Sequence, residues 1–195
     1  VKFIGQAATL LENDGKRILI DPFISGNPLV DDLDPMDLDV DAILVTHGHG
    51  DHFGDTIDIA KNCDALLIGI HELALFCQGQ GVENVHGMSI GGGYDFDFGR
   101  VKMVPALHSG GMVTEEGIIY LGSPCGYVIE MGDITIYHAG DTGLFGDMSL
   151  IGEEFDIDLA FLPIGDNYVM GPKDALKAVN LLKPKGVVPI HYNTF

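Results

Sequence analysis

Four potential metal ligands lie within six residues of this chain, directly after a short apolar run. Residues 45–54 read VTHGHGDHFG, and four of them carry side chains that bind divalent cations: His47, His49, Asp51 and His52. The run before them, residues 41–45, is apolar after its first position and predicts a buried strand. If the backbone stays extended past this strand, residues 47, 49 and 51 point to one side, and a helix can begin at residue 52. The segment therefore predicts a metal site at the end of a buried strand.

The overall composition is that of an ordinary globular domain. The chain has 195 residues, and the 46% that are hydrophobic can form one sizeable core. It contains no run of about 18 apolar residues, so no membrane span is expected. The first residues lack the basic and apolar regions of a signal peptide. The three cysteines, Cys63, Cys77 and Cys125, are not closely spaced, which indicates reduced thiols in a cytoplasmic protein.

The charge balance narrows the range of partners. Acidic residues outnumber basic ones by 29 to 10, and the formal net charge is −19. Nucleic acids and anionic membranes repel such a surface, so neither is an expected partner. A small-molecule substrate is expected instead, and the oligomeric state, a homo-oligomer included, stays open.

Hydrophobic periodicity predicts many short strands and three helices along the chain. The expected strands are residues 7–12, 17–20, 41–45, 65–70, 100–105, 127–130, 134–138, 159–163 and 187–190, with sheet edges at 85–88 and 94–98. The expected helices are residues 55–61, 72–78 and 172–182. Residues 24–40 and 109–126 are expected to be loops, since they are rich in glycine, proline or aspartate. Asp21 closes the second strand, where the sequence favours a turn former over a carboxylate that supports a metal ligand.

Three further potential ligands follow apolar runs near the ends of predicted strands: His108, Asp141 and His191. Parallel strands lead into loops at one edge of a sheet, and this edge is a common site of chemistry. With the first four ligands, these residues supply five imidazoles and two carboxylates. That set suffices for two divalent ions if one carboxylate bridges them.

With this set of residues the chain resembles the metallo-β-lactamase-fold hydrolase superfamily. The matching residues occur in the family's order over nearly the whole chain: Asp21, His47, His49, Asp51, His52, His108, Asp141 and His191. The resemblance is closest to a branch of small metal-dependent hydrolases, with ascorbate-phosphate lactonases as more distant relatives. It implies a mixed α/β (α+β) fold, a four-layer αββα sandwich, built by residues 1–195 as a single domain.

The resemblance also implies an enzyme, a metal-dependent hydrolase of a small ester, lactone or phosphoester. Carried over residue by residue, it assigns one ion to His47, His49 and His108, and a second to Asp51, His52 and His191. Asp141 bridges the two, and Asp51 and Asp141 are the expected catalytic carboxylates. Two such ions lower the pKa of a bound water to about 7, and Asp51 is expected to orient the resulting hydroxide. Zn²⁺ is the default metal, although Mn²⁺, Fe²⁺ and Ni²⁺ accept the same ligands.

The sequence departs from the family pattern at two places. Many members of the branch carry a histidine near position 6, where this chain has Gln6, and this difference is expected to affect substrate contacts rather than the metal site. The chain also stops soon after His191, whereas relatives usually continue with another strand or helix, which indicates a domain truncated at its C-terminus.

The remaining histidines and the long loop carry weaker expectations. His71 and His86 are expected to be surface or capping residues, whereas His138 is equally consistent with a role beside the metal site and with a buried sheet position. The glycine-rich segment 109–126 leaves directly from His108 and contains several apolar residues. We expect it to act as a mobile flap over a partly apolar substrate, with an ordinary surface loop as the alternative.

Two other activities are known for the same fold. An RNA-processing nuclease requires a basic surface, which the excess of acidic residues disfavours. A di-iron redox protein of this fold tends to carry a glutamate in place of the middle histidine and to have a flavin domain; this chain has His49 and no room for that domain. A purely structural metal site is disfavoured because it needs only four ligands.

Overall fold

Two six-stranded mixed sheets form the framework of the chain. The computed structural model describes residues 1–195, which divide into two compact units. The first unit comprises residues 1–89, 109–124 and 194–195, and the second comprises residues 90–108 and 125–193. The helices are short, and none is long and apolar enough to cross a lipid bilayer.

The first sheet begins with an antiparallel hairpin and continues with parallel strands. Its strands, in spatial and chain order, are β1 (Lys2–Gly5), β2 (Ala8–Asn13), β3 (Lys16–Ile20), β4 (Ala42–Leu44), β5 (Leu66–Ile70) and β6 (Val85–Met88). β1, β2 and β3 are antiparallel neighbours, whereas β3 to β6 are parallel. The predicted turn between β2 and β3 contains Asp14 and Gly15 with φ of 48° and 78°, the left-handed conformation that two-residue hairpins require.

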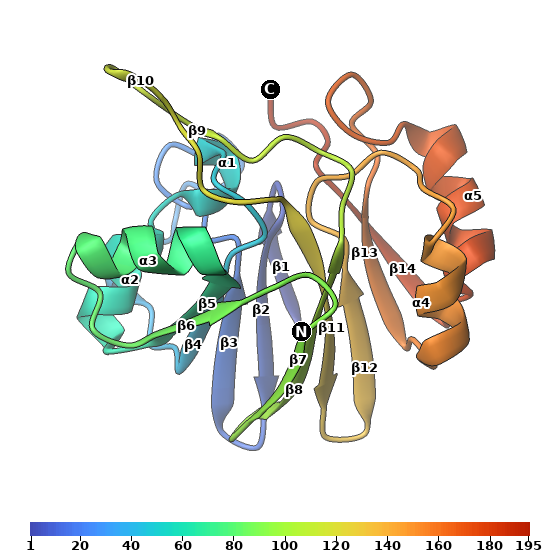
Figure 1. The fold of residues 1–195 in the computed structure, drawn as a ribbon, viewed down its shortest axis with the longest axis horizontal. Coiled ribbons are helices and arrows are strands. Elements are labelled where there is room, and N and C mark those ends of the chain that lie inside the picture. The colour runs from blue at the N-terminus through green and yellow to red at the C-terminus, as the bar shows by residue number, and fades with distance from the viewer. The chain divides into compact units, whose positions relative to one another are not determined.

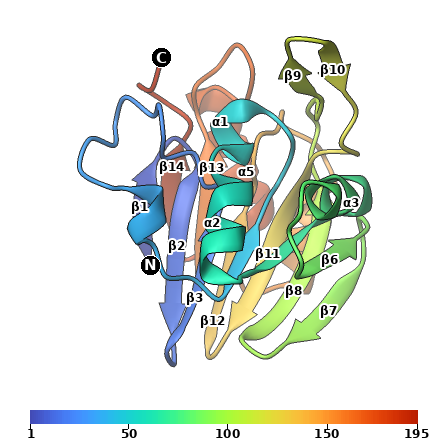
Figure 2. The ribbon, with the colours of Figure 1, turned by 90° about the vertical axis from the view of Figure 1, so that its left-hand side faces the viewer.

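Helices of the first unit follow its parallel strands. They are the 3₁₀ helix η1 (Pro35–Asp37) and the α-helices α1 (Gly50–Phe53), α2 (Thr56–Cys63) and α3 (His71–Gly79). Figure 1 and Figure 2 show α2 and α3 against the same face of this sheet. Their inward side chains, among them Ile59 and Leu73, are buried, as the amphipathic pattern of the two segments predicts. The parallel connections place the carboxyl ends of β3 and β4 side by side, and the segment of four predicted ligands begins there.

The second sheet has the spatial order β14-β13-β12-β11-β8-β7. Its strands are β7 (Gly93–Phe96), β8 (Gly99–Pro105), β11 (Cys125–Met131), β12 (Ile134–His138), β13 (Leu159–Pro163) and β14 (Gly186–Ile190). β12, β13 and β14 are parallel, and the other neighbours are antiparallel. Helices α4 (Met148–Glu154) and α5 (Pro172–Leu182) lie side by side in Figure 1 and pack on an apolar cluster of this sheet that includes Tyr137 and Leu162. The limits predicted for the helix at residues 172–182 are confirmed.

The segment predicted as a loop at residues 109–126 contains regular structure. Residues 112–114 (β9, Met112–Thr114) and 117–119 (β10, Gly117–Ile119) pair as an antiparallel hairpin of the first unit, and Cys125 already begins β11. The hairpin stands clear of α3 in Figure 2. Local pattern did not indicate it because each strand has only three residues, too few for an alternation to be visible.

Candidate metal centre

The ligand segment, residues 47–52 with the four predicted metal ligands of the first unit, leaves the sheet after β4. Val45 continues the sheet by one backbone hydrogen bond to Ile68 O, 3.0 Å, and the chain then stays irregular until α1 begins at Gly50. His49 precedes this helix with extended backbone, and Asp51 lies in its first turn. The expectation that residues 47, 49 and 51 alternate along an extended strand is therefore wrong for Asp51. A helical turn brings its carboxylate next to His52 instead, as their side-chain distance shows.

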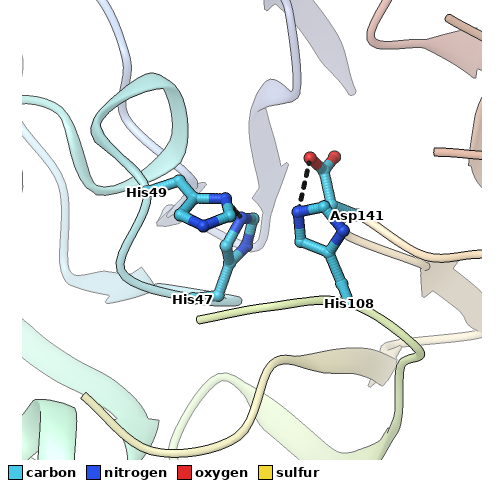
Figure 3. Close-up of side chains that lie close together, drawn as sticks. All are labelled: His47, His49, His108 and Asp141. Carbon is cyan, nitrogen blue, oxygen red and sulfur yellow. Dashed lines mark hydrogen bonds and ion pairs between the residues drawn. The ribbon is translucent and has the colours of Figure 1, made fainter. Parts of the chain in front are cut away.

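Ring nitrogens and carboxylate oxygens of this segment converge in two pairs. His47 Nε2 lies 3.0 Å from His49 Nδ1, and the two rings meet edge to face (Figure 3). His52 Nε2 lies 3.8 Å from Asp51 Oδ2. His47 and His52 are buried, whereas the Asp51 side chain keeps 26% of its surface exposed. Each pair can offer two lone pairs to one cation.

Polar neighbours occupy the ring nitrogens that point away from these pairs. Thr46 Oγ1 lies 2.9 Å from His47 Nδ1, Asp21 Oδ2 lies 2.8 Å from His52 Nδ1, and Ser109 Oγ lies 3.3 Å from His49 Nε2. A hydrogen bond at one ring nitrogen fixes the tautomer and the orientation that the other presents. The arrangement leaves Nε2 of His47 and His52, and Nδ1 of His49, available as metal donors.

Asp21 is both a turn residue and a support for the ligands. Its φ of 47° is left-handed, as expected for a turn, but its side chain is fully buried. Besides the His52 contact, it accepts hydrogen bonds from Thr46 N at 2.8 Å and from Thr46 Oγ1 at 2.7 Å. Asp21 therefore has both of the roles that the sequence left open. Its buried contacts were not evident, because burial at the carboxyl ends of β3 and β4 is a consequence of topology and leaves no local pattern.

Gln6 is a second residue whose role the sequence did not reveal. Its Nε2 donates to Asp51 Oδ2 at 2.7 Å, so the side chain touches a predicted metal ligand. The expectation that position 6 concerns substrate contacts but not the metal site is corrected by this contact. In the sequence, position 6 stood out only because many relatives carry a histidine there.

The three ligands of the second unit meet around one carboxylate oxygen. Asp141 Oδ2 lies 3.4 Å from His108 Nε2 and 3.0 Å from His191 Nε2. Figure 3 shows the first of these contacts. Asp141 is buried, and both imidazoles are nearly so. An oxygen that reaches two imidazole nitrogens at once is suited to bridge two ions that each take one of those imidazoles.

Topology explains why residues so distant in sequence converge. β8 and β12 flank β11 and are antiparallel to it, so both end at the same edge, and β14 is parallel to β12. Two hydrogen bonds then join the loops that follow β8 and β12. Leu107 N donates to Thr142 Oγ1 at 3.0 Å, and Gly143 N donates to Leu107 O at 2.9 Å. These bonds place His108 beside Asp141.

The other histidines have distinct positions. His138 is buried at the end of β12; its Nδ1 accepts from Gly140 N at 3.2 Å, and its ring stacks on Phe161. It therefore supports the turn that presents Asp141. His71 is exposed at the start of α3, in line with the surface or capping role expected for it, whereas His86 is half-buried within β6.

The residues present fit divalent metal ions. The donors are imidazole nitrogens and carboxylate oxygens, and within each unit they lie close together, as the 3.0 Å from His47 to His49 and the 3.0 Å from Asp141 to His191 show. The remote nitrogens of His47, His49 and His52 all have polar partners. Support of this kind behind the ligands is characteristic of metal sites and is not needed by a surface histidine.

Comparison with known proteins agrees with this chemistry. Residues 1–191 match the family model described as a beta-lactamase superfamily domain. A UPF0173 metal-dependent hydrolase from Geobacillus thermodenitrificans is 56% identical over an alignment that covers 100% of this chain and 86% of the relative.

Solved structures extend the likeness to three dimensions. Igni18, a metallo hydrolase from Ignicoccus hospitalis, is 37% identical with a TM-score of 0.89, over 99% of this chain and 82% of that protein. An isothiocyanate hydrolase from Delia radicum gut bacteria is 26% identical with a TM-score of 0.75, over 98% of this chain and 84% of that protein. The predicted mixed α/β fold is confirmed, and the chain belongs to the metallo-β-lactamase-fold superfamily as a metal-dependent hydrolase.

Proposed function

We propose that this hydrolase works with two divalent ions. The first would be held by His47, His49 and His108, the second by Asp51, His52 and His191, and Asp141 would contribute to both. The observation that carries the proposal is the position of Asp141 Oδ2, close to the imidazole of one ligand from each set, at 3.4 Å and 3.0 Å. Zn²⁺ is the expected metal because imidazole dominates the set, with Mn²⁺, Fe²⁺ and Ni²⁺ as chemically acceptable substitutes.

The chain's own residues supply orientation and charge at this centre. When bound, a pair of divalent ions acidifies a coordinated water and polarises the scissile carbonyl or phosphoryl group. Thr46 and Asp21 hold the rings of His47 and His52 in place, and Gly143 and Thr142 hold the loop of His108. Asp51 and Asp141 would supply the carboxylate oxygens of the centre and would offset part of the charge of the ions. The reaction class is hydrolysis of a small ester, lactone or phosphoester.

The β9–β10 hairpin is the segment that we assign to substrate recognition. Its strands expose apolar side chains, with Val113 and Ile118 each 76% exposed, and its turn exposes Glu115 and Glu116. Its base is anchored at the ligand segment, because Ser109 contacts His49 and Leu121 packs against Gly48. An apolar hairpin tethered beside metal ligands suits a substrate with an apolar part and one anionic or carbonyl oxygen.

Metal analysis followed by an activity screen tests the proposal. Protein purified without chelator is expected to contain two equivalents of a divalent transition metal per chain, and to hydrolyse at least one of a panel of lactones, thioesters, phosphodiesters and isothiocyanates. The last class is included because a solved relative acts on it. Protein that binds one equivalent or none when saturated with Zn²⁺ contradicts the dinuclear centre. Iron that changes absorbance on reduction, or salt-dependent RNA binding, indicates the redox or nuclease alternative instead.

The hairpin has its own test and control. Val113→Ser with Ile118→Ser removes exposed apolar surface and is expected to raise KM several-fold at unchanged metal content. Leu176→Ser on α5 removes an apolar side chain that is also well exposed and is the matched control. Equal kinetics of both variants would show that the hairpin does not recognise the substrate.

A further inference from the structure

Gln6 occupies a backbone position that its residue type does not favour. It lies in the tight connection between β1 and β2, where Gly5 pairs with Ala8, and has a φ of 53°. Glycine or asparagine adopts this left-handed conformation more readily than a long side chain does. The side chain is also almost completely buried, at 1% exposure, although it is polar. A strained, buried glutamine in place of a turn residue indicates that its amide group has a function.

Both ends of the amide are engaged. Nε2 donates to Asp51 Oδ2 at 2.7 Å, and Oε1 accepts a short hydrogen bond from Thr194 Oγ1. The orientation of the amide follows from chemistry, because an ionised carboxylate only accepts hydrogen bonds and must face the NH₂ group. Thr194 is itself buried, so its hydroxyl restrains the amide from the other side.

Asp51 needs such a restraint. It lies in the first turn of a four-residue helix, and its side chain keeps 26% of its surface exposed, whereas His47 and His52 are buried. Two side-chain torsions set the position of this carboxylate. The Gln6 hydrogen bond fixes the rotation in which Oδ2 lies 3.8 Å from His52 Nε2, the pair of atoms that one ion would share.

We propose that Gln6 is a positioning residue for the metal centre, which sets the Asp51 carboxylate for the ion shared with His52 while Thr194 holds the Gln6 amide. This inference rests on the proposed dinuclear function and deepens it. Gln6 does for Asp51 what Asp21 does for His52: it supplies the outer hydrogen bond that fixes a ligand. The role is selective, because Gln6 contacts a ligand of only one ion.

Zn²⁺ titration against a chelating indicator tests the inference without any substrate. Gln6→Asn is the main variant, because asparagine tolerates the left-handed backbone but withdraws the amide by one methylene group. One of the two Zn²⁺ ions is expected to bind about 10- to 100-fold more weakly, with the other unchanged. Co²⁺ in the same protein is expected to show an altered visible spectrum. Thr194→Val, which leaves Gln6 in place, is expected to weaken the same binding step by a smaller factor.

Thr9→Val is the matched control. It removes another buried hydrogen bond of the same hairpin, from Thr9 Oγ1 to Ala7 O, without touching a ligand, and both Zn²⁺ affinities are expected to persist. Unchanged affinities in Gln6→Asn and Thr194→Val overturn the inference and leave the proposed function intact. Equal weakening of both steps, matched by Thr9→Val, overturns it as a general effect of destabilising the hairpin. Failure of the unmodified protein to bind Zn²⁺ overturns the proposed function and the inference together.

Discussion

The two units build the same strand arrangement and use it differently. In each, three neighbouring parallel strands form part of the sheet, β3-β4-β5 in the first unit and β12-β13-β14 in the second. An aspartate directly before the middle strand accepts a hydrogen bond from the backbone of the preceding strand, Asp41 from Arg17 N and Asp158 from Thr135 N, both at 2.8 Å. Lys16 and Lys185 contact these two carboxylates.

The opposite, carboxyl ends of these strands differ. The first unit places its four predicted ligands in one segment after β4, whereas the second has one predicted ligand after each of β8, β12 and β14. A single segment keeps its ligands together by covalent connection. Ligands on three strand ends come together only when the sheet has formed. The same framework can therefore bring predicted metal ligands together within one segment or from several strand ends. Mutations in the two units should therefore differ in their effects on metal binding.

The largest expected effect is at the shared carboxylate of the second unit. Asp141→Ala removes the oxygen that lies near both His108 and His191, and activity is expected to fall more than about 100-fold, beyond the usual effect of an outer supporting residue. His138→Ala, three positions earlier, removes only a support for the turn and is expected to cost less. Activity assays with metal analysis compare the two, and equal losses in folded proteins would mean that the roles are assigned incorrectly.

A substitution at His49, a predicted ligand of the first unit, can be compared with the one at Asp141. His49→Ala removes a donor from one proposed ion only, since the close partner of its Nδ1 is His47. We expect this variant to retain one tightly bound Zn²⁺, whereas Asp141→Ala should weaken both. Zn²⁺ titration of the two variants measures this directly, and weakening of a single step in Asp141→Ala would argue against the bridge.

The contrast also explains how much could be predicted from the sequence. His47, His49, Asp51 and His52 form a local motif, so a metal site could be predicted from these residues without any structure. His108 and His191 are single residues after apolar runs, and only their order and the family resemblance identified them. The strands around them were predicted from periodicity, but three-residue strands such as β9 and the short helix α4 carry too little pattern to detect. The contacts of Asp21 and Gln6 were not predicted, because they join residues that are far apart in sequence.

The next effect concerns the buried support of the first unit. Asp21→Ala leaves Thr46 N and His52 Nδ1 without their carboxylate, and each buried polar group left unsatisfied costs about 1–3 kcal/mol. Denaturant unfolding is expected to show a loss of this size, and Zn²⁺ affinity is expected to fall about 10- to 100-fold. Thr142→Val, which removes the single hydroxyl that supports the loops of the second unit, serves as the comparison and should destabilise less. A larger loss in Thr142→Val would reverse the ranking of the two supports.

A smaller effect is expected where the hairpin segment packs on the ligand segment. A Cβ at Gly48 would lie 2.8 Å from Leu121 Cδ1 and 2.9 Å from Gly110 O, so Gly48→Ala must displace residues 109–124 or the ligands. Overpacking of this kind costs about 1–3 kcal/mol, and KM is expected to rise more than kcat falls if the hairpin moves. Gly50→Ala, whose added Cβ would meet no atom within 4 Å, is the control. Equal kinetics in the two variants would show that the packing of the hairpin segment on Gly48 does not affect catalysis.

The smallest effect tests the feature that the two units share. The hydrogen bond from Arg17 N and the nearby Lys16 hold the pKa of Asp41 below its usual value, and Lys185 and Thr135 N do the same for Asp158. A carboxyl whose pKa is lowered by folding stabilises the protein above its unfolded pKa of about 3.9, and this contribution is lost as the pH falls through the folded pKa.

Asp41→Asn is therefore expected to cost less than about 1 kcal/mol at pH 7, since the group is near the surface. Asp158→Asn is also expected to be mildly destabilising at pH 7, and for both variants the difference from the unmodified protein should shrink below about pH 4. Thermal unfolding between about pH 3 and pH 7 measures the stability difference between each variant and the unmodified protein. A difference in one variant only would show that the two aspartates, alike in their hydrogen bonds, do not stabilise their units alike.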